Sequence, residues 1–196
     1  MKIIISDAQL RRLIPHVLAT VEGEATLFEK LTPFLETSEE WVRQYFVPDD
    51  LFDLVAEYSA SAETAAENST IAAIHATLEK VIAYHSYMTA IPSLDLVLTP
   101  NGFGIVSNQN IAPASKDRVD RLLASLEAER DQAIELLLPR LPLLADWQQS
   151  AQGQYFAATL FPNLSLCRRL AIKQHLWAEY QALHDRLIKI ENTLAE

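Results

Sequence analysis

Two of the five histidines have a carboxylate one helical turn further along the chain. His75 precedes Glu79 and His175 precedes Glu179, and an i, i+4 spacing places both members of a pair on one helix face. A metal ion could use such a pair, but two ligands do not complete a site, and neither His-Glu-x-x-His nor a Cys/His cluster occurs in the sequence. The spacing therefore predicts ion pairs on helix surfaces, with no metal and no cofactor.

Other reactive residues also lack partners. The single cysteine, Cys167, could act as a nucleophile only beside a base, and although Arg168 and Arg169 could lower its pKa, a partly buried structural thiol is the better interpretation. Gly102-Phe103-Gly104 resembles a phosphate loop, but the third glycine and the Lys-Ser/Thr pair are missing. The sequence therefore predicts no enzyme.

Four acidic residues share one predicted helix. Their scattered spacing is typical of a solvated helix face rather than of a paired acid and base. They are Glu127, Glu129, Asp131 and Glu135.

Composition limits the partners of this chain. With 196 residues and a formal charge of −10, it is expected to form one helical domain over residues 1–196 that has no specific grip on nucleic acid and no affinity for anionic membranes. The N-terminal apolar run is too short for a signal peptide, and no run approaches a membrane span. A single cysteine indicates a reducing compartment. We therefore expect a cytosolic location.

Apolar residues at helical spacing run through most of the chain. The pattern predicts long helices over residues 63–90 and 115–138, and further helices near the start and from residue 164 onward. Pro33 is predicted to break one helix, with Thr37 or Ser38 capping the next, and Ile91-Pro92 is predicted to end another.

Residues 91–115 interrupt the helical pattern. Leu94, Leu96 and Leu98 alternate with other residues at a period of two, which is typical of a strand, and Pro100-Asn101-Gly102 is a turn signal. We expect a β-hairpin between the two long helices, with an irregular loop as the alternative. The predicted fold class is thus mainly α: a helical bundle with one β-hairpin inserted between two long helices.

Phe103, Ile105 and Val106 make the tip of this hairpin apolar. These side chains could fold back on their own helices, or they could insert into a neighbouring subunit, since an exposed apolar element with open strand edges is a site for a partner. Both alternatives stay open at the level of the sequence, and the three residues are the candidate protein-interaction site.

A weak internal similarity links the two ends of the chain. Leu10-Arg11-Arg12-Leu13 resembles Cys167-Arg168-Arg169-Leu170, and an aromatic-spaced helix is predicted after each. The pattern indicates that a C-terminal helical unit, residues 154–196, repeats residues 6–46, although amphipathic helices also look alike by chance.

The central segment also resembles a known group of proteins. Residues 91–122, from Ile-Pro-Ser-Leu-Asp-Leu through Gly-Phe-Gly-Ile-Val to Asp-Arg-Val-Asp-Arg-Leu, are similar to the signature of an uncharacterised protein family from prophages of gut Bacteroidales. Members of that family resemble the head–tail connector, or adaptor, proteins of tailed phages in layout. The resemblance implies a small helical protein that forms rings and has no active site.

The resemblance and the residues together suggest a function. We expect a non-enzymatic structural protein of phage or prophage origin, a head–tail connector or head-completion component. Its expected partners are itself, as a ring oligomer, and other phage structural proteins. The alternative is a cytosolic helical binding module for a peptide or small ligand, and an enzyme is the third class considered.

Overall fold

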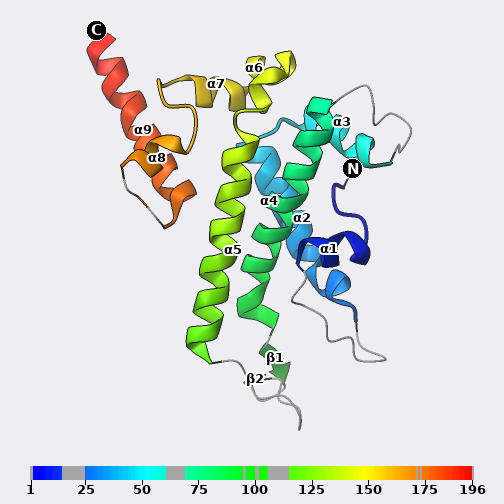
Figure 1. Ribbon diagram of the computed structural model, residues 1–196. Coiled ribbons are helices and arrows are strands. Elements are labelled where there is room, and N and C mark those ends of the chain that lie inside the picture. Colours follow the sequence, from blue (N-terminus) through cyan, green and yellow to red (C-terminus); the bar gives the residue numbers. More distant parts are fainter. Residues whose placement is uncertain are drawn as a thin grey trace.

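The computed structural model describes residues 2–14, 25–60, 69–94, 96–99, 102–105, 115–170, 172 and 174–195. The described chain is mainly helical, as predicted (Figure 1). In order, its elements are α1 (Asp7–Leu13), α2 (Leu27–Tyr45), α3 (Asp49–Ala60), α4 (Ser69–Leu94), β1 (Leu96–Thr99), β2 (Gly102–Ile105), α5 (Lys116–Leu137), the 3₁₀ turn η1 (Leu141–Leu143), α6 (Ala145–Gln149), α7 (Ala151–Ala157), α8 (Ser165–Arg169) and α9 (Leu176–Ala195).

The α4 helix is the centre of the packing. It contacts α5, α2, α3 and α1, and in Figure 1 it runs alongside α5 for most of its length. A helix that packs against neighbours on several sides is apolar around most of its circumference. Accordingly, α4 buries Ile74, Leu78, Val81, Ile82, Ala83 and Ala90.

The predicted break at Pro33 is wrong, because α2 continues through it from Leu27 to Tyr45. The helix begins at Thr26, whose hydroxyl accepts from the Glu29 amide while the Glu29 carboxylate accepts from the Thr26 amide. This capping box satisfies the first free amides of α2. Thr37, expected as a cap, instead lies inside the helix and donates to the Pro33 carbonyl at 3.0 Å.

The predicted end at Ile91-Pro92 is also placed too early. The α4 helix passes Pro92 and ends at Leu94. Proline removes one amide donor and crowds the carbonyl four residues earlier, which costs most in a helix interior. Because Pro92 lies in the last turn, little helix remains beyond it to be disrupted.

Two short antiparallel strands follow α4. Leu96 lies opposite Ile105 and Leu98 opposite Phe103, and this β1–β2 ribbon connects the C-terminal end of α4 toward the N-terminal end of α5. In Figure 1 the ribbon extends beyond the ends of the two long helices, away from α6 and α7.

The C-terminal third consists of shorter elements than predicted. Ser150 caps the start of α7, where its hydroxyl accepts from the Gly153 amide. The helix expected from residue 164 onward is divided into α8 and α9, and His175 between them has a φ of 52°. Residues 154–196 contain the end of α7, the short α8 and the long α9, whereas the described part of residues 6–46 contains α1 and α2. The proposed duplication of residues 6–46 stays a prediction.

Candidate functional site: an apolar pocket beyond the end of α5

A pocket of about 550 Å³ lies where the chain leaves α5 and turns through η1, α6 and α7. None of its lining residues is charged. They are Leu138, Pro139, Pro142, Trp147, Gln148, Gly153, Phe156, Ala157, Thr159, Leu160, Pro162 and Asn163. A cavity of this size, mainly apolar and with a few amide and hydroxyl groups, is typical of a binding site for an apolar group.

Three contacts hold the walls of the pocket in place. The Trp147 indole donates to the Phe46 carbonyl at 2.6 Å, which joins α6 to the end of α2. The Arg140 guanidinium donates to the Thr77 hydroxyl at 2.5 Å, which joins the segment after α5 to α4. Gly153 allows α7 to approach α6 closely, since a Cβ atom there would lie 2.0 Å from the Trp147 carbonyl oxygen.

Exposed apolar side chains stand beside the pocket. Leu160, which lines it, is 82% exposed, and its neighbour Phe161 is 37% exposed. Leu143, next to the lining residue Pro142, is 68% exposed. A cluster of exposed apolar residues around a pocket marks a contact surface more often than a site of chemistry. The pocket lining contains no carboxylate, histidine, lysine or cysteine that could act as an acid, base or nucleophile.

Two of the three predicted interaction residues, Phe103 and Ile105, precede the N-terminal end of α5, whereas the pocket follows its C-terminal end. Phe103 and Ile105 belong to β2, where their backbones pair with Leu98 and Leu96. Val106 lies outside the described residues, as do the side chains of Phe103 and Ile105. The structure therefore places the backbones of Phe103 and Ile105 away from the pocket of the same chain (Figure 1). The pocket itself was missed from the sequence, because it is built from helices too short to show a hydrophobic period.

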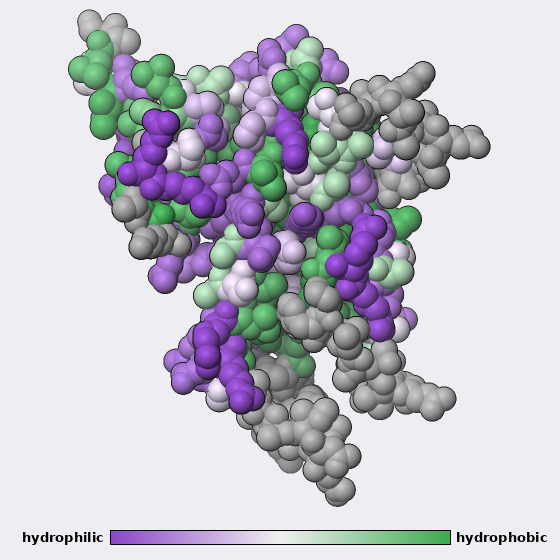
Figure 2. Space-filling model, in the orientation of Figure 1, coloured by the Kyte–Doolittle hydropathy of each residue, from purple (hydrophilic) through white to green (hydrophobic). Residues whose placement is uncertain are grey.

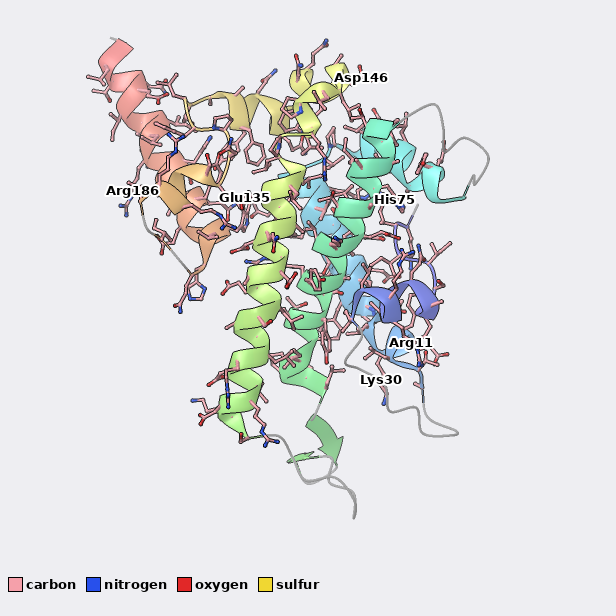
Figure 3. All side chains as sticks on the ribbon, viewed as in Figure 1. Arg11, Lys30, His75, Glu135, Asp146 and Arg186 are labelled. Carbon is pink, nitrogen blue, oxygen red and sulfur yellow. The ribbon has the colours of Figure 1, made fainter. Side chains whose placement is uncertain are left out.

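The sequence predicts His75 and Glu79 on a helix surface, but both are buried within α4, beside α3 (Figure 3). Glu79 accepts from the Arg12 guanidinium at 3.1 Å and from the Gln9 amide at 3.0 Å, so its partners come from α1. Burial lowers the pKa of His75, which opposes its protonation. Glu79 thus fastens α1 to α4, whereas the buried His75 Nε2 has no hydrogen-bond partner within the described part of the chain.

The acidic residues of α5 also differ from prediction. Asp131 is buried, and its carboxylate accepts from the Arg130 guanidinium at 2.7 Å and from the Trp177 amide at 3.3 Å. Glu127 pairs with His175 at 2.8 Å, and this contact raises the His175 pKa. Both acids therefore hold the N-terminal end of α9, where a helix has free amide donors and a positive dipole end.

Ser38 and His85 form a pair that the sequence did not suggest. The Ser38 hydroxyl lies 2.9 Å from His85 Nδ1 and 2.7 Å from the Phe34 carbonyl oxygen. The His85 ring stacks on Trp41 at 4.1 Å, and burial together with the nearby Arg130 lowers its pKa to about 4. A serine beside a histidine can be a nucleophile and its base. Ser38, however, is completely buried, so no substrate can reach it.

Cys167 lies in the core with no exposed surface, and burial raises the pKa of its thiol. Arg168 pairs with Glu135 of α5 at 2.6 Å instead of activating the thiol. These contacts agree with a structural role for Cys167.

A second, more polar hollow of about 460 Å³ lies between α7 and α9. Its lining includes Tyr155, whose hydroxyl donates to Asp185 at 2.9 Å, and the amides of Gln152 and Gln181. Burial and the Asp185 charge raise the Tyr155 pKa, so the phenol stays protonated and acts as a donor. The hollow offers hydrogen bonds but no pair of groups suited to acid–base exchange.

Among the described residues, no group of three or more His, Cys, Asp or Glu side chains could hold a metal ion. No helix in the same residues is long and apolar enough to cross a membrane.

Residues 31–157, more than half of the chain and including α4, the ribbon, α5 and most of the apolar pocket, match the family described as "Family of unknown function (DUF6712)". The chain belongs to this family. No curated protein and no solved structure matches the chain.

Proposed function

We propose that this protein is a non-enzymatic structural subunit of phage or prophage origin, acting as a head–tail connector or head-completion component. One observation carries the proposal: an apolar β-ribbon at the far end of a rigid pair of long helices, α4 and α5, extends beyond them (Figure 1). In this proposal the ribbon, with Phe103 and Ile105 on β2, is an arm that contacts a neighbouring subunit.

The physical features of the chain support this role. A ring subunit needs a stiff body, and α4 packed on α5 and α2 provides one. It needs an element that reaches its neighbour, and an apolar ribbon with open strand edges is suited to that. A contact between two different surfaces of successive copies closes into a ring when the rotation between them divides a full turn. The formal charge of −10 fits a channel wall that does not hold DNA.

Electron microscopy of the purified protein, combined with its mass from light scattering, tests this proposal. Closed rings of uniform diameter, with a mass equal to a whole number of subunits, are the expected result. Particles of irregular size, or a monomer at every protein concentration tried, would contradict it.

A second candidate function is a helical module that binds a peptide or small ligand. The apolar pocket of about 550 Å³ favours it. Under this alternative, apolar ligands would raise the melting temperature of a monomeric protein by mass action. A monomer that is stabilised in this way would favour the binding module over the ring subunit.

A further inference from the structure

The two longest stretches without a charged residue lie at opposite ends of α5. One runs between Asp95 and Lys116 and includes both strands of the ribbon. The other runs between Asp146 and Arg168 and includes α7 and most of the pocket lining. In a chain with 42 charged residues (16 basic and 26 acidic), uncharged stretches of this length are unusual.

The charge pattern decides where two copies of this protein can meet. Each copy carries a net charge of −10, so two copies repel each other over most of their surface. Where both contacting surfaces are uncharged, this repulsion is weakest. No charged group then has to be removed from water when the contact forms. The ribbon and the pocket are two such surfaces, and both are rich in apolar residues.

The length of α5 excludes a contact within one chain. The ribbon precedes its first residue and the pocket follows its last, and its 22 residues span about 33 Å at the usual rise. In Figure 3 the label of Asp146 marks α6 at one end of the molecule, and the ribbon lies at the other. A ribbon that occupies a pocket must therefore occupy the pocket of a second copy.

We propose that the β1–β2 ribbon of one copy docks into the apolar pocket beyond α5 of the next copy. This inference rests on the proposed function and names the surface that receives the arm. The contact joins two different surfaces, so it leaves a free ribbon at one end and a free pocket at the other, and successive copies can add until a ring closes.

The dimensions and chemistry of the pocket suit this occupant. Its volume of about 550 Å³ exceeds that of a single aromatic side chain and falls in the usual range for bound groups. The lining includes the buried rings of Trp147 and Phe156, which are 3% and 1% exposed, and Leu160, which is 82% exposed and offers apolar surface to an incoming aromatic residue such as Phe103. Gln148, Thr159 and Asn163 supply donors and acceptors for the open backbone edge of the ribbon.

Disulfide trapping between two differently tagged copies tests the contact without depending on how many copies form a ring. One copy carries Phe103→Cys and the other Leu160→Cys, and mild oxidation joins them if the two positions meet. A Leu194→Cys copy is the matched control, because Leu194 is 81% exposed, nearly as much as Leu160, but belongs to α9 and does not line the pocket. The native Cys167 is completely buried and should stay unreacted.

We expect the Phe103→Cys copy to join the Leu160→Cys copy at least tenfold faster than the Leu194→Cys copy. Equal rates, or faster joining of two Phe103→Cys copies to each other, would overturn the proposed receiving site. In either of those cases rings seen by microscopy would still support the ring subunit. If the Phe103→Cys and Leu160→Cys copies join but no rings form, the ring subunit is overturned while the contact between the two surfaces is supported.

A second variant checks the result in the unmodified chain. Leu160→Asp places a charge at the pocket without disturbing the core, since the side chain is 82% exposed. We expect it to weaken self-association at least tenfold, while Leu194→Asp leaves it unchanged. Self-association of Leu160→Asp equal to that of the wild type would overturn the inference.

Discussion

At the scale of single residues, the buried polar groups hold helices together rather than perform chemistry. Ser38 and His85 look like the start of a catalytic arrangement, yet Ser38 is completely buried and its hydroxyl also contacts the Phe34 carbonyl oxygen. Burial favours the neutral imidazole at His85, which stacks on Trp41. The consequence of this placement is a dependence of stability on pH.

His85 should make the protein less stable in mild acid. Its pKa falls from 6.5 in the unfolded chain to about 4 in the folded one, so between these values the unfolded state binds an extra proton. Stability is complete above pH 6.5 and decreases as the pH falls toward 4, by up to about 3 kcal/mol for a shift of this size. Urea unfolding of the wild type and of His85→Phe, which keeps a ring against Trp41, measures the effect. The same pH dependence in both proteins would contradict it.

At the scale of the elements, capping residues decide where a helix begins. The Thr26 capping box starts α2, and α2 then continues through Pro33, while Thr37 and Ser38 donate to carbonyls one turn earlier. A threonine hydroxyl that bonds within a helix contributes little to stability, whereas a cap satisfies amides that would otherwise lack a partner.

Replacing the cap should therefore cost more than replacing the interior threonine. We expect Thr26→Ala to lower the free energy of unfolding by about 1 kcal/mol and Thr37→Ala to change it by less than about 0.5 kcal/mol. Chemical denaturation of the two variants makes the comparison. If Thr37→Ala proves the more destabilising, α2 does not begin where the structure places it.

The attachment of α9 depends on a residue of α5. The Asp131 carboxylate is 2% exposed, and it compensates the buried Arg130 guanidinium while accepting from the Trp177 amide. Removing one member of a buried ion pair leaves the other without compensation. We expect Asp131→Ala to cost about 3 kcal/mol, whereas Glu129→Ala, an exposed position on the same helix, should cost less than about 0.5 kcal/mol. Equal unfolding midpoints for the two variants would contradict this attachment.

The sequence predicts these elements unevenly, and the reasons are physical. Helical spacing indicated the long helices correctly, because burial repeats along one chain segment. The capping box Thr26-x-x-Glu29 is present in the sequence but was missed, and a cap was expected instead at Thr37 or Ser38 after a break at Pro33. The burial of Asp131 could not be predicted, because the amide it accepts from lies 46 residues further along the chain. The pocket depends on the same kind of long-range contact, between Trp147 and Phe46.

At the scale of the whole molecule, charge opposes association and the uncharged surfaces permit it. Hydrophilic residues gather over the lower end of α5 in Figure 2, whereas residues 96–115, which precede this helix in the sequence, include no charged residue. With a formal charge of −10 on each copy, self-association works against a long-range repulsion that dissolved salt screens.

Association should therefore strengthen as salt is added. The Debye length falls from about 30 Å at 0.01 M to about 8 Å at 0.15 M ionic strength, which shortens the repulsion while leaving an apolar contact intact. We expect the mass of the wild type in light scattering to rise over this range at a fixed protein concentration. A mass that falls with added salt would indicate that ion pairs, not apolar surfaces, join the copies.

The measurement that tests the central claim most directly is the solution mass of Phe103→Asp beside that of the wild type and Leu194→Asp, over a range of protein concentrations. If the ribbon joins neighbouring subunits, a charge at Phe103 should leave the protein folded but monomeric, while the wild type and Leu194→Asp assemble alike. Circular dichroism confirms that the helices of each variant are retained. A Phe103→Asp protein that assembles like the wild type would contradict the claim that the ribbon is the contact.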